Sequence, residues 1–252
     1  MRITIITVSY NSASTIADTM RSVARQLHPD IEHIVVDGGS TDETLAIIKA
    51  TGPHVASVVS ESDKGIYDAM NKGLLLATGE FVGFLNADDM LASPETVAKI
   101  VAAASALADV VYGDLVYVDK DRPTKVIRYW SSGAFSAGRL KYGWMPPHPT
   151  LYLRRSVQQT LGEFDLRLRI AADYDFMLRC LSRPGLRVAY LPEVLVRMRT
   201  GGASNRSLKA LRNKSREDLV ALRKNRVGGW LTLLCKNGRK LPQYFRRPES
   251  VA

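Results

Sequence analysis

Residues 81–90 constrain the fold more than any other part of the sequence. Residues 81–85 are apolar or glycine, which predicts a short strand that is buried on both faces. Three oxygen-bearing side chains follow it: Asn86, Asp88 and Asp89. Open α/β sheets bind ligands just beyond the carboxyl ends of their strands, so we expect these side chains at a binding site.

The residues of this cluster allow two interpretations. Adjacent carboxylates repel each other, and a divalent cation, Mn²⁺ or Mg²⁺, bound together with substrate phosphates would relieve the repulsion. Alternatively, the Asn and Asp side chains close a turn, and Asp89 or Ser93 caps the next helix. The rest of the chain has to distinguish the two.

Strand-like and helix-like patterns alternate along the chain. Apolar runs at 3–8, 31–36 and 55–59 predict strands, and helical spacing after each of the first two predicts helices. This alternation predicts an α/β fold, a Rossmann-like, mostly parallel sheet with helices on both faces. Later strands are predicted at 110–112, 115–118, 126–129, 147–153 and 187–191, later helices at 63–77, 93–108 and 171–179, and a long loop at 131–147.

The net positive charge is confined to the C-terminal part. Residues 200–252 hold 13 Lys/Arg and 3 Asp/Glu, whereas residues 1–199 hold 22 of each. We therefore predict a domain over 1–205 and a basic, amphipathic, helical extension over 206–252. An apolar patch between its basic clusters favours an anionic membrane surface over nucleic acid as the partner. The patch consists of Trp230, Leu231, Leu233 and Leu234.

Compartment is indicated by what the sequence lacks. Cys180 and Cys235 form neither a disulfide framework nor a zinc-binding spacing. A strand-like run begins at Ile3, which leaves no room for a signal peptide, and no stretch approaches the roughly 18 apolar residues of a membrane span. We expect a cytoplasmic protein, peripheral on the inner face of the cytoplasmic membrane.

Five motifs in order resemble those of family 2 glycosyltransferases with the GT-A fold. They are TVSYN at 7–11, VDGGSTD at 36–42, DKGIYDAMNKG at 63–73, FLNADD at 84–89 and ADYD at 172–175. The branch most resembled builds bacterial capsules, colanic-acid-like exopolysaccharides and O-antigens. The resemblance implies inverting sugar transfer from a nucleotide-sugar donor, with UDP favoured over GDP or dTDP, to a glycan or polyprenyl-linked acceptor.

The resemblance also implies which residues bind the nucleotide. Thr7, Ser9 and Tyr10 would line the base pocket, with Tyr10 offering a stacking face. Asp37 would accept a hydrogen bond from the base, as a carboxylate can from a uracil N–H. A purely turn-forming role for Asp37 before Gly38 is equally open.

Further binding residues are implied later in the chain. Asp63 and Lys64 match sugar- and phosphate-facing positions, and Asn71 follows a methionine where many relatives carry arginine. His148 lies on the acceptor-side loop, where it would touch diphosphate or acceptor. Arg199 stands where some relatives have a metal-binding histidine; because arginine cannot ligate a metal, it would contact phosphate.

The resemblance implies that carboxylates bind the metal and accept the proton in the sugar transfer. Asn86 and Asp88 would lie near ribose and sugar, and Asp89 would ligate Mn²⁺ or Mg²⁺. Inverting transfer requires a base for the acceptor hydroxyl. Asp173 matches the family's base position, although Ala replaces the usual preceding Glu, and Asp175 is the second candidate.

Other classes of protein fit less well. A sugar-nucleotide pyrophosphorylase needs a glycine-rich basic loop after the first strand, and a dinucleotide-binding oxidoreductase needs G-x-G-x-x-G there; residues 9–12 offer neither. The alternative that remains is a non-catalytic nucleotide-binding or scaffold protein of the same fold at the membrane surface. The presence of Asp88, Asp89 and Asp173 disfavours it.

Overall fold

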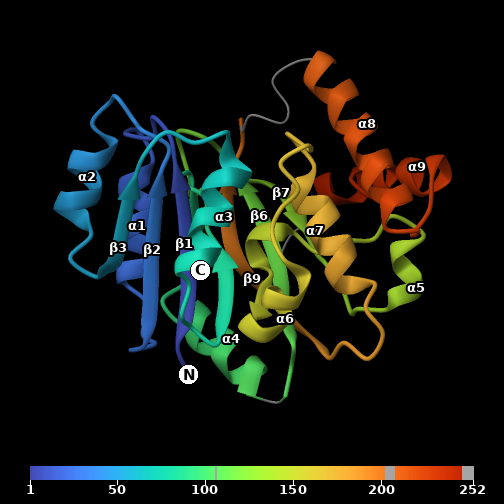
Figure 1. The fold of residues 1–252 in the computed structure, drawn as a ribbon, viewed down its shortest axis with the longest axis horizontal. Coiled ribbons are helices and arrows are strands. Elements are labelled where there is room, and N and C mark those ends of the chain that lie inside the picture. The colour runs from blue at the N-terminus through green and yellow to red at the C-terminus, as the bar shows by residue number, and fades with distance from the viewer. Residues whose placement is uncertain (106, 202–207, 246–252) are drawn as a thin grey trace.

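A central sheet organises the molecule (Figure 1). The computed structural model describes residues 1–105, 107–201 and 208–245. Within them a nine-stranded sheet has the order β3-β2-β1-β4-β8-β6-β9-β5, with β7 also paired to β6. The strands are β1 Ile3–Ser9, β2 Ile31–Asp37, β3 Val55–Ser60, β4 Phe81–Phe84, β5 Asp89–Leu91, β6 Val110–Val118, β7 Val126–Trp130, β8 Tyr152–Arg154 and β9 Val188–Arg199.

Helices cover both faces of this sheet. Side chains of β1 divide between the two faces, because Ile6 and Val8 pack with α3 and α7 whereas Ile3 and Ile5 pack with α1 and α4. The predicted α/β architecture is therefore confirmed. The helices are α1 Ile16–Ala24, α2 Thr44–Thr51, α3 Ile66–Leu76, α4 Thr96–Ser105, α5 Ala137–Leu140, α6 Arg155–Leu161, α7 Ala172–Leu181, α8 Leu208–Lys224 and α9 Trp230–Gly238, with 3₁₀ turns η1 His148–Thr150 and η3 Leu241–Tyr244.

The two halves of the sheet differ in strand direction. β1 pairs in parallel with β2 and β4, and β2 with β3, so the carboxyl ends of these strands meet at one edge. β8 is antiparallel to β4 and β6, β7 to β6, and β5 to β9. Neither the short strand β5 nor the second half of β9 was predicted from the sequence. Both depend on pairing with other strands of the sheet and show no local pattern of their own.

The C-terminal extension packs onto the rest of the molecule, with α8 beside α7 and α9 beside α8 (Figure 1). Leu219, Leu222 and Leu233 belong to the same buried cluster as Tyr174 and Phe176 of α7. The helical character of the extension is confirmed. The predicted division at residues 205/206 lies outside the described residues. None of the helices that the structure describes has both the length and the apolarity to cross a bilayer.

Candidate functional site

Asp37 stabilises the loop that follows β2 through hydrogen bonds. Its carboxylate accepts hydrogen bonds from the hydroxyls of Ser9, Ser40 and Ser60 and from the N–H groups of Gly39 and Ser40. Burial alone would raise the pKa of Asp37, but the hydrogen bonds from Ser40, Ser60 and Ser9 outweigh burial and lower it. A carboxylate has about four acceptor positions. This geometry favours the turn-forming role of Asp37 over contact with a base.

Tyr10 and Thr7 differ sharply in exposure. Tyr10, directly after β1, is 63% exposed, which leaves its ring available for stacking on a base. Thr7 is fully buried, and its hydroxyl lies 2.9 Å from Nε2 of His33. The expectation that Thr7 lines the base pocket is not supported, because helices cover both faces of β1 at this depth.

Asp63 lies against the loop after β2. A Cβ atom on Gly38 would fall 2.4 Å from Oδ2 of Asp63, so a side chain at this position would require the carboxylate to shift. The other oxygen, Oδ1, accepts the N–H of Gly65 at 2.8 Å. Asp63 is partly exposed and Lys64 is exposed, so both remain available to a ligand at this edge.

The cluster beyond β4 contains unpartnered oxygens. Asp89 is fully buried, and its Oδ2 accepts a hydrogen bond from the amide of Asn86 at 3.2 Å. Oδ1 of Asp89 and Oδ1 of Asn86 are buried without a hydrogen-bond partner. Burial, and next the charge of Asp88, raise the pKa of Asp89 well above its usual range. Carboxylate and amide oxygens are ligands of hard cations, so the residues fit Mn²⁺ or Mg²⁺.

Such a cation would need further ligands. Residues 1–105, 107–201 and 208–245 contain no group of three or more His, Cys, Asp or Glu side chains that could hold a metal. Mg²⁺ sites commonly use one or two carboxylates and complete their shell with water and substrate phosphates. The pair of Asp88 and Asp89 is typical of that arrangement, and Asp88 is the more exposed of the two.

Arg199 supports this cluster from inside the protein. Its buried guanidinium donates to the backbone oxygens of Asp88 at 3.1 Å and Lys120 at 3.3 Å, and it pairs with Asp18 at 2.5 Å. The expectation that Arg199 contacts phosphate is not supported, because the guanidinium is buried and each of its three nitrogens donates to a protein oxygen. Instead, Arg199 joins the end of β9 to the loop that carries the carboxylates.

Asp173 is held in the first turn of α7. The single O–H of Tyr67 is shared between two acceptors, Oδ1 of Asp173 at 3.1 Å and the backbone oxygen of Ile170 at 2.8 Å. Burial and the charge of Asp173 raise the pKa of Tyr67, so the phenol stays protonated. His148 is buried and stacks on Phe84; burial lowers its pKa, and the charge of Asp173 opposes that shift. A partly exposed carboxylate held in this way suits a proton acceptor.

Asn71 and Asp175 serve the fold in this structure. The buried amide of Asn71 exchanges two hydrogen bonds with the backbone of Phe164, so its expected contact with the ligand is not supported. Asp175 is fully buried and is paired with Arg179 and Lys224. Asp173 is therefore the better-placed base of the two.

Tyr67 and Glu217 were not among the predicted site residues. The carboxylate of Glu217 accepts hydrogen bonds from the backbone just before α7. Tyr67 lies within the motif at 63–73, which was a usable signal. Glu217 lies in the basic extension and contacts residues far away in the sequence, so no local pattern identifies it.

The family follows from sequence comparison. The family described as "Glycosyl transferase family 2" matches residues 4–162, more than half of the chain. This chain belongs to that family. The glycosyltransferase is 37% identical over 207 residues to a "PGL/p-HBAD biosynthesis glycosyltransferase" of Mycobacterium bovis (strain BCG / Pasteur 1173P2), covering 80% of this chain and 78% of that relative.

Solved structures show the same fold. S. aureus TarS 1-349 in complex with UDP-GlcNAc matches with a TM-score of 0.67 at 22% identity, over 90% of this chain and 70% of that one. In the match to a longer TarS chain, this protein spans 40% of the length of that chain. The mannosyltransferase PcManGT of Pyrobaculum calidifontis, in complex with GDP-Man and Mn²⁺, matches with a TM-score of 0.65 at 23% identity. The match covers 97% of this chain and 73% of that one. The glycosyltransferase therefore has the GT-A fold.

Proposed function

We propose that this glycosyltransferase transfers a sugar, with inversion at the anomeric carbon, from a nucleotide-sugar donor to a lipid-linked glycan. UDP is the favoured nucleotide, and GDP and dTDP are the alternatives. The observation that carries the proposal is the buried, unpartnered Oδ1 of Asp89 beside Asp88 at the end of a central strand. Such an oxygen is costly unless a cation binds it.

The residues divide the chemistry between them. The acceptor oxygen bonds to the anomeric carbon while the bond to the diphosphate oxygen breaks, and the electron pair leaves with the diphosphate. Asp173 takes the proton of the acceptor hydroxyl, and Tyr67 holds the Asp173 carboxylate in place. Asp88 and Asp89 would hold Mn²⁺ or Mg²⁺, which when bound stabilises the charge on the leaving diphosphate.

The donor side is supported by exposed residues and by the solved neighbours. Tyr10, Asp63 and Lys64 are at least partly exposed beside the loops after β1 and β2, where they would contact the base, sugar or phosphate. Neighbours of the same fold are complexes with UDP-GlcNAc and with GDP-Man and Mn²⁺. These support a nucleotide sugar with a divalent metal for this chain.

A screen tests the donor and the metal together. UDP-glucose, UDP-N-acetylglucosamine, GDP-mannose and dTDP-rhamnose are added to the protein with Mn²⁺, with Mg²⁺ or with EDTA, and the melting temperature is measured. We expect one nucleotide to stabilise the protein only with metal. Release of the nucleotide diphosphate in wild type but not in Asp173→Asn would support catalysis. A metal-dependent shift with no release from any donor and acceptor would favour a scaffold role.

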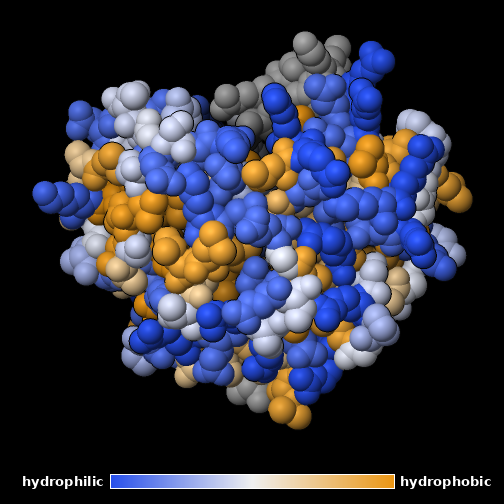
Figure 2. Space-filling view, viewed as in Figure 1, coloured by the Kyte–Doolittle hydropathy of each residue, from blue (hydrophilic) through white to orange (hydrophobic). Residues whose placement is uncertain are grey.

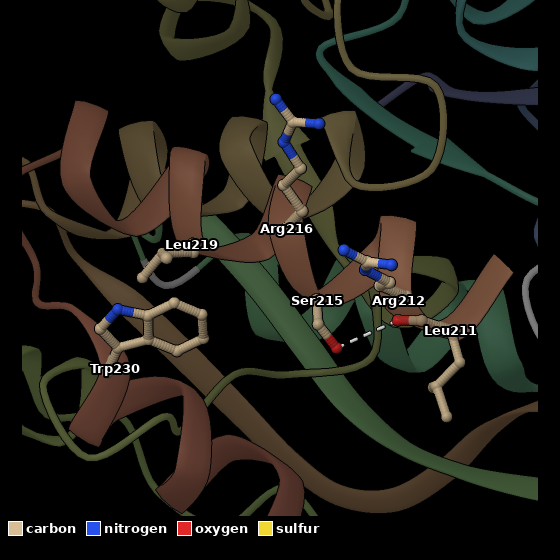
Figure 3. A pocket seen from close by; sticks show the side chains of 6 residues that line it. All are labelled: Leu211, Arg212, Ser215, Arg216, Leu219 and Trp230. Carbon is tan, nitrogen blue, oxygen red and sulfur yellow. Dashed lines mark hydrogen bonds between the residues drawn. The ribbon is translucent and has the colours of Figure 1, made fainter. Parts of the chain in front are cut away.

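We also propose that the extension holds the enzyme at an anionic membrane, near a lipid-linked acceptor. Hydrophobic and hydrophilic residues interleave on the surface formed by α8 and α9 (Figure 2). A groove of about 570 Å³ lies on the extension, and Figure 3 shows its apolar and basic side chains together. Its lining residues are Leu211, Arg212, Ser215, Arg216, Leu219 and Trp230. This composition suits anionic lipid, because cationic and apolar groups lie on one surface.

The structure changes how the membrane proposal is tested. Removing the extension would expose the core, because Leu219, Leu222 and Leu233 are buried against α7. Substitution of exposed side chains therefore tests this proposal better than removal of the extension does.

A further inference from the structure

The C-terminal extension reaches the start of the helix that carries Asp173. Oε2 of Glu217, on α8, accepts the backbone N–H of Ile170 at 2.8 Å and that of Ala171 at 3.0 Å. The first N–H groups of a helix lack partners within the helix. Ala171, at the N-cap of α7, has no polar side chain to bind them. Glu217 binds the backbone one step earlier than an N-cap side chain would: it fixes the two residues that precede α7.

The same backbone segment is held from its other side by Tyr67. The phenol donates to the carbonyl oxygen of Ile170, whose N–H is bound by Glu217, and also to Oδ1 of Asp173. Both backbone polar groups of Ile170 are therefore held: the carbonyl oxygen by Tyr67 of α3, and the N–H by Glu217 of α8. Asp173 lies three residues further on, so its carboxylate takes its position from this doubly held segment.

Glu217 is itself on a firmly docked helix. The ammonium of Lys224 lies 2.9 Å from Asp165 and 3.1 Å from Asp175, which ties the C-terminal end of α8 to α7 and the loop before it. Asp218, next to Glu217, is buried in an ion pair of 2.6 Å with Lys236 of α9. A side chain anchored on both flanks can set a neighbouring backbone accurately.

We propose that Glu217 is a positioning residue for Asp173. By fixing the N–H groups of Ile170 and Ala171, it orients the first turn of α7 so that the Asp173 carboxylate faces the acceptor hydroxyl. The basic extension is then part of the catalytic apparatus as well as a membrane-facing segment. This inference rests on the proposed function of Asp173 as the base.

The experiment compares Glu217→Ala and Glu217→Gln with Val227→Ala, which weakens the buried packing of the same extension beyond the end of α8. Two quantities are measured: hydrogen exchange of the backbone at 168–174, and turnover of the sugar nucleotide that the donor screen selects, over a range of pH. We expect Glu217→Ala to speed exchange at Ile170 and Ala171 and to lower kcat between about 10- and 100-fold, with KM for the donor unchanged.

The remaining variants separate positioning from folding. Glu217→Gln keeps an acceptor oxygen, so it should restore part of kcat and of the exchange protection, with a changed pH profile because a charge near Asp173 is lost. Val227→Ala should lower the melting temperature with kcat within twofold of wild type. Unchanged exchange in Glu217→Ala, or an equal loss of kcat in Val227→Ala, overturns the proposal. Full activity of Asp173→Asn would instead overturn the proposed base, and exchange would still report whether Glu217 fixes the segment.

Discussion

Leu231 and Leu233 lie two residues apart on α9 and face opposite environments. Leu231 is 74% exposed, whereas Leu233 is 4% exposed and packs into the core beneath α7 and α8. Residues two apart on a helix do not share a face. The apolar patch predicted from the sequence is therefore two surfaces: Trp230, Leu231 and Leu234 face outward, and Leu233 belongs to the core.

The outward surface yields a prediction about membrane binding. Leu231→Glu should weaken co-sedimentation with vesicles of phosphatidylglycerol. The change removes apolar area that would be buried in the membrane and adds repulsion from the anionic lipid. Leu75→Glu is the matched control, since Leu75 is equally exposed but lies on α3. Equal binding by both variants and the wild type would contradict the membrane role.

The hydroxyl of Tyr67 should matter for turnover. Tyr67→Phe removes the hydrogen bonds to Asp173 and Ile170, and should cost about 1–3 kcal/mol of stability because two partly buried acceptors lose their donor. We expect kcat to fall about tenfold while donor affinity is kept. Tyr112→Phe serves as control: its hydroxyl donates to the backbone of Gly133 at 2.7 Å, so urea denaturation should show a similar loss of stability without the loss of kcat.

Asp89→Asn should have opposite effects with and without metal. In EDTA the variant should melt at a higher temperature than the wild type, because it removes a buried carboxylate that has an unpartnered oxygen and a like charge beside it. With Mn²⁺ the thermal shift of the wild type should be lost. Asp37→Asn should melt lower in both conditions, because the Asp37 carboxylate is fully hydrogen-bonded. A full Mn²⁺ shift in Asp89→Asn would remove Asp89 from the metal site.

His33 should make the fold sensitive to acid. Burial, and next the nearby His54, lower the pKa of His33 from 6.5 to about 3. Between these two values the unfolded state binds a proton that the folded state does not, so the free energy of unfolding falls as the pH falls from about 6.5 to about 3. His33→Gln should show a shallower fall in urea denaturation between pH 7 and pH 4. Identical slopes would indicate that other groups dominate the acid response.

Much of the fold was predictable from local pattern. The apolar runs and helical spacings of residues 1–77 predicted strands β1 to β3 and the helices between them, because burial on a given face imposes a repeat on neighbouring residues. Elements without such a repeat were missed. α6 follows β8 without an intervening loop, and β5 is a three-residue strand held by β9.

The candidate site was only partly readable in advance. The sequence placed carboxylates after β4 and at the start of α7, and the structure has them there. That Asp88 and Asp89 bind a metal ion, and that Asp173 accepts a proton, stay predictions. The structure alone revealed that Thr7, Asn71 and Arg199 have their polar groups engaged inside the protein. Hydrogen-bond satisfaction depends on partners brought from elsewhere in the chain, and no local pattern records it.

By itself, then, the sequence determined the alternation of strands and helices, the family and the order of the charged motifs. Only the tertiary structure decided which side chains remain available to a ligand, and that a glutamate in a basic extension binds the start of the Asp173 helix. The physical reason is distance along the chain. Periodicity arises between neighbours a few residues apart, whereas the contact of Glu217 with Ile170 exists only once the extension has packed against α7.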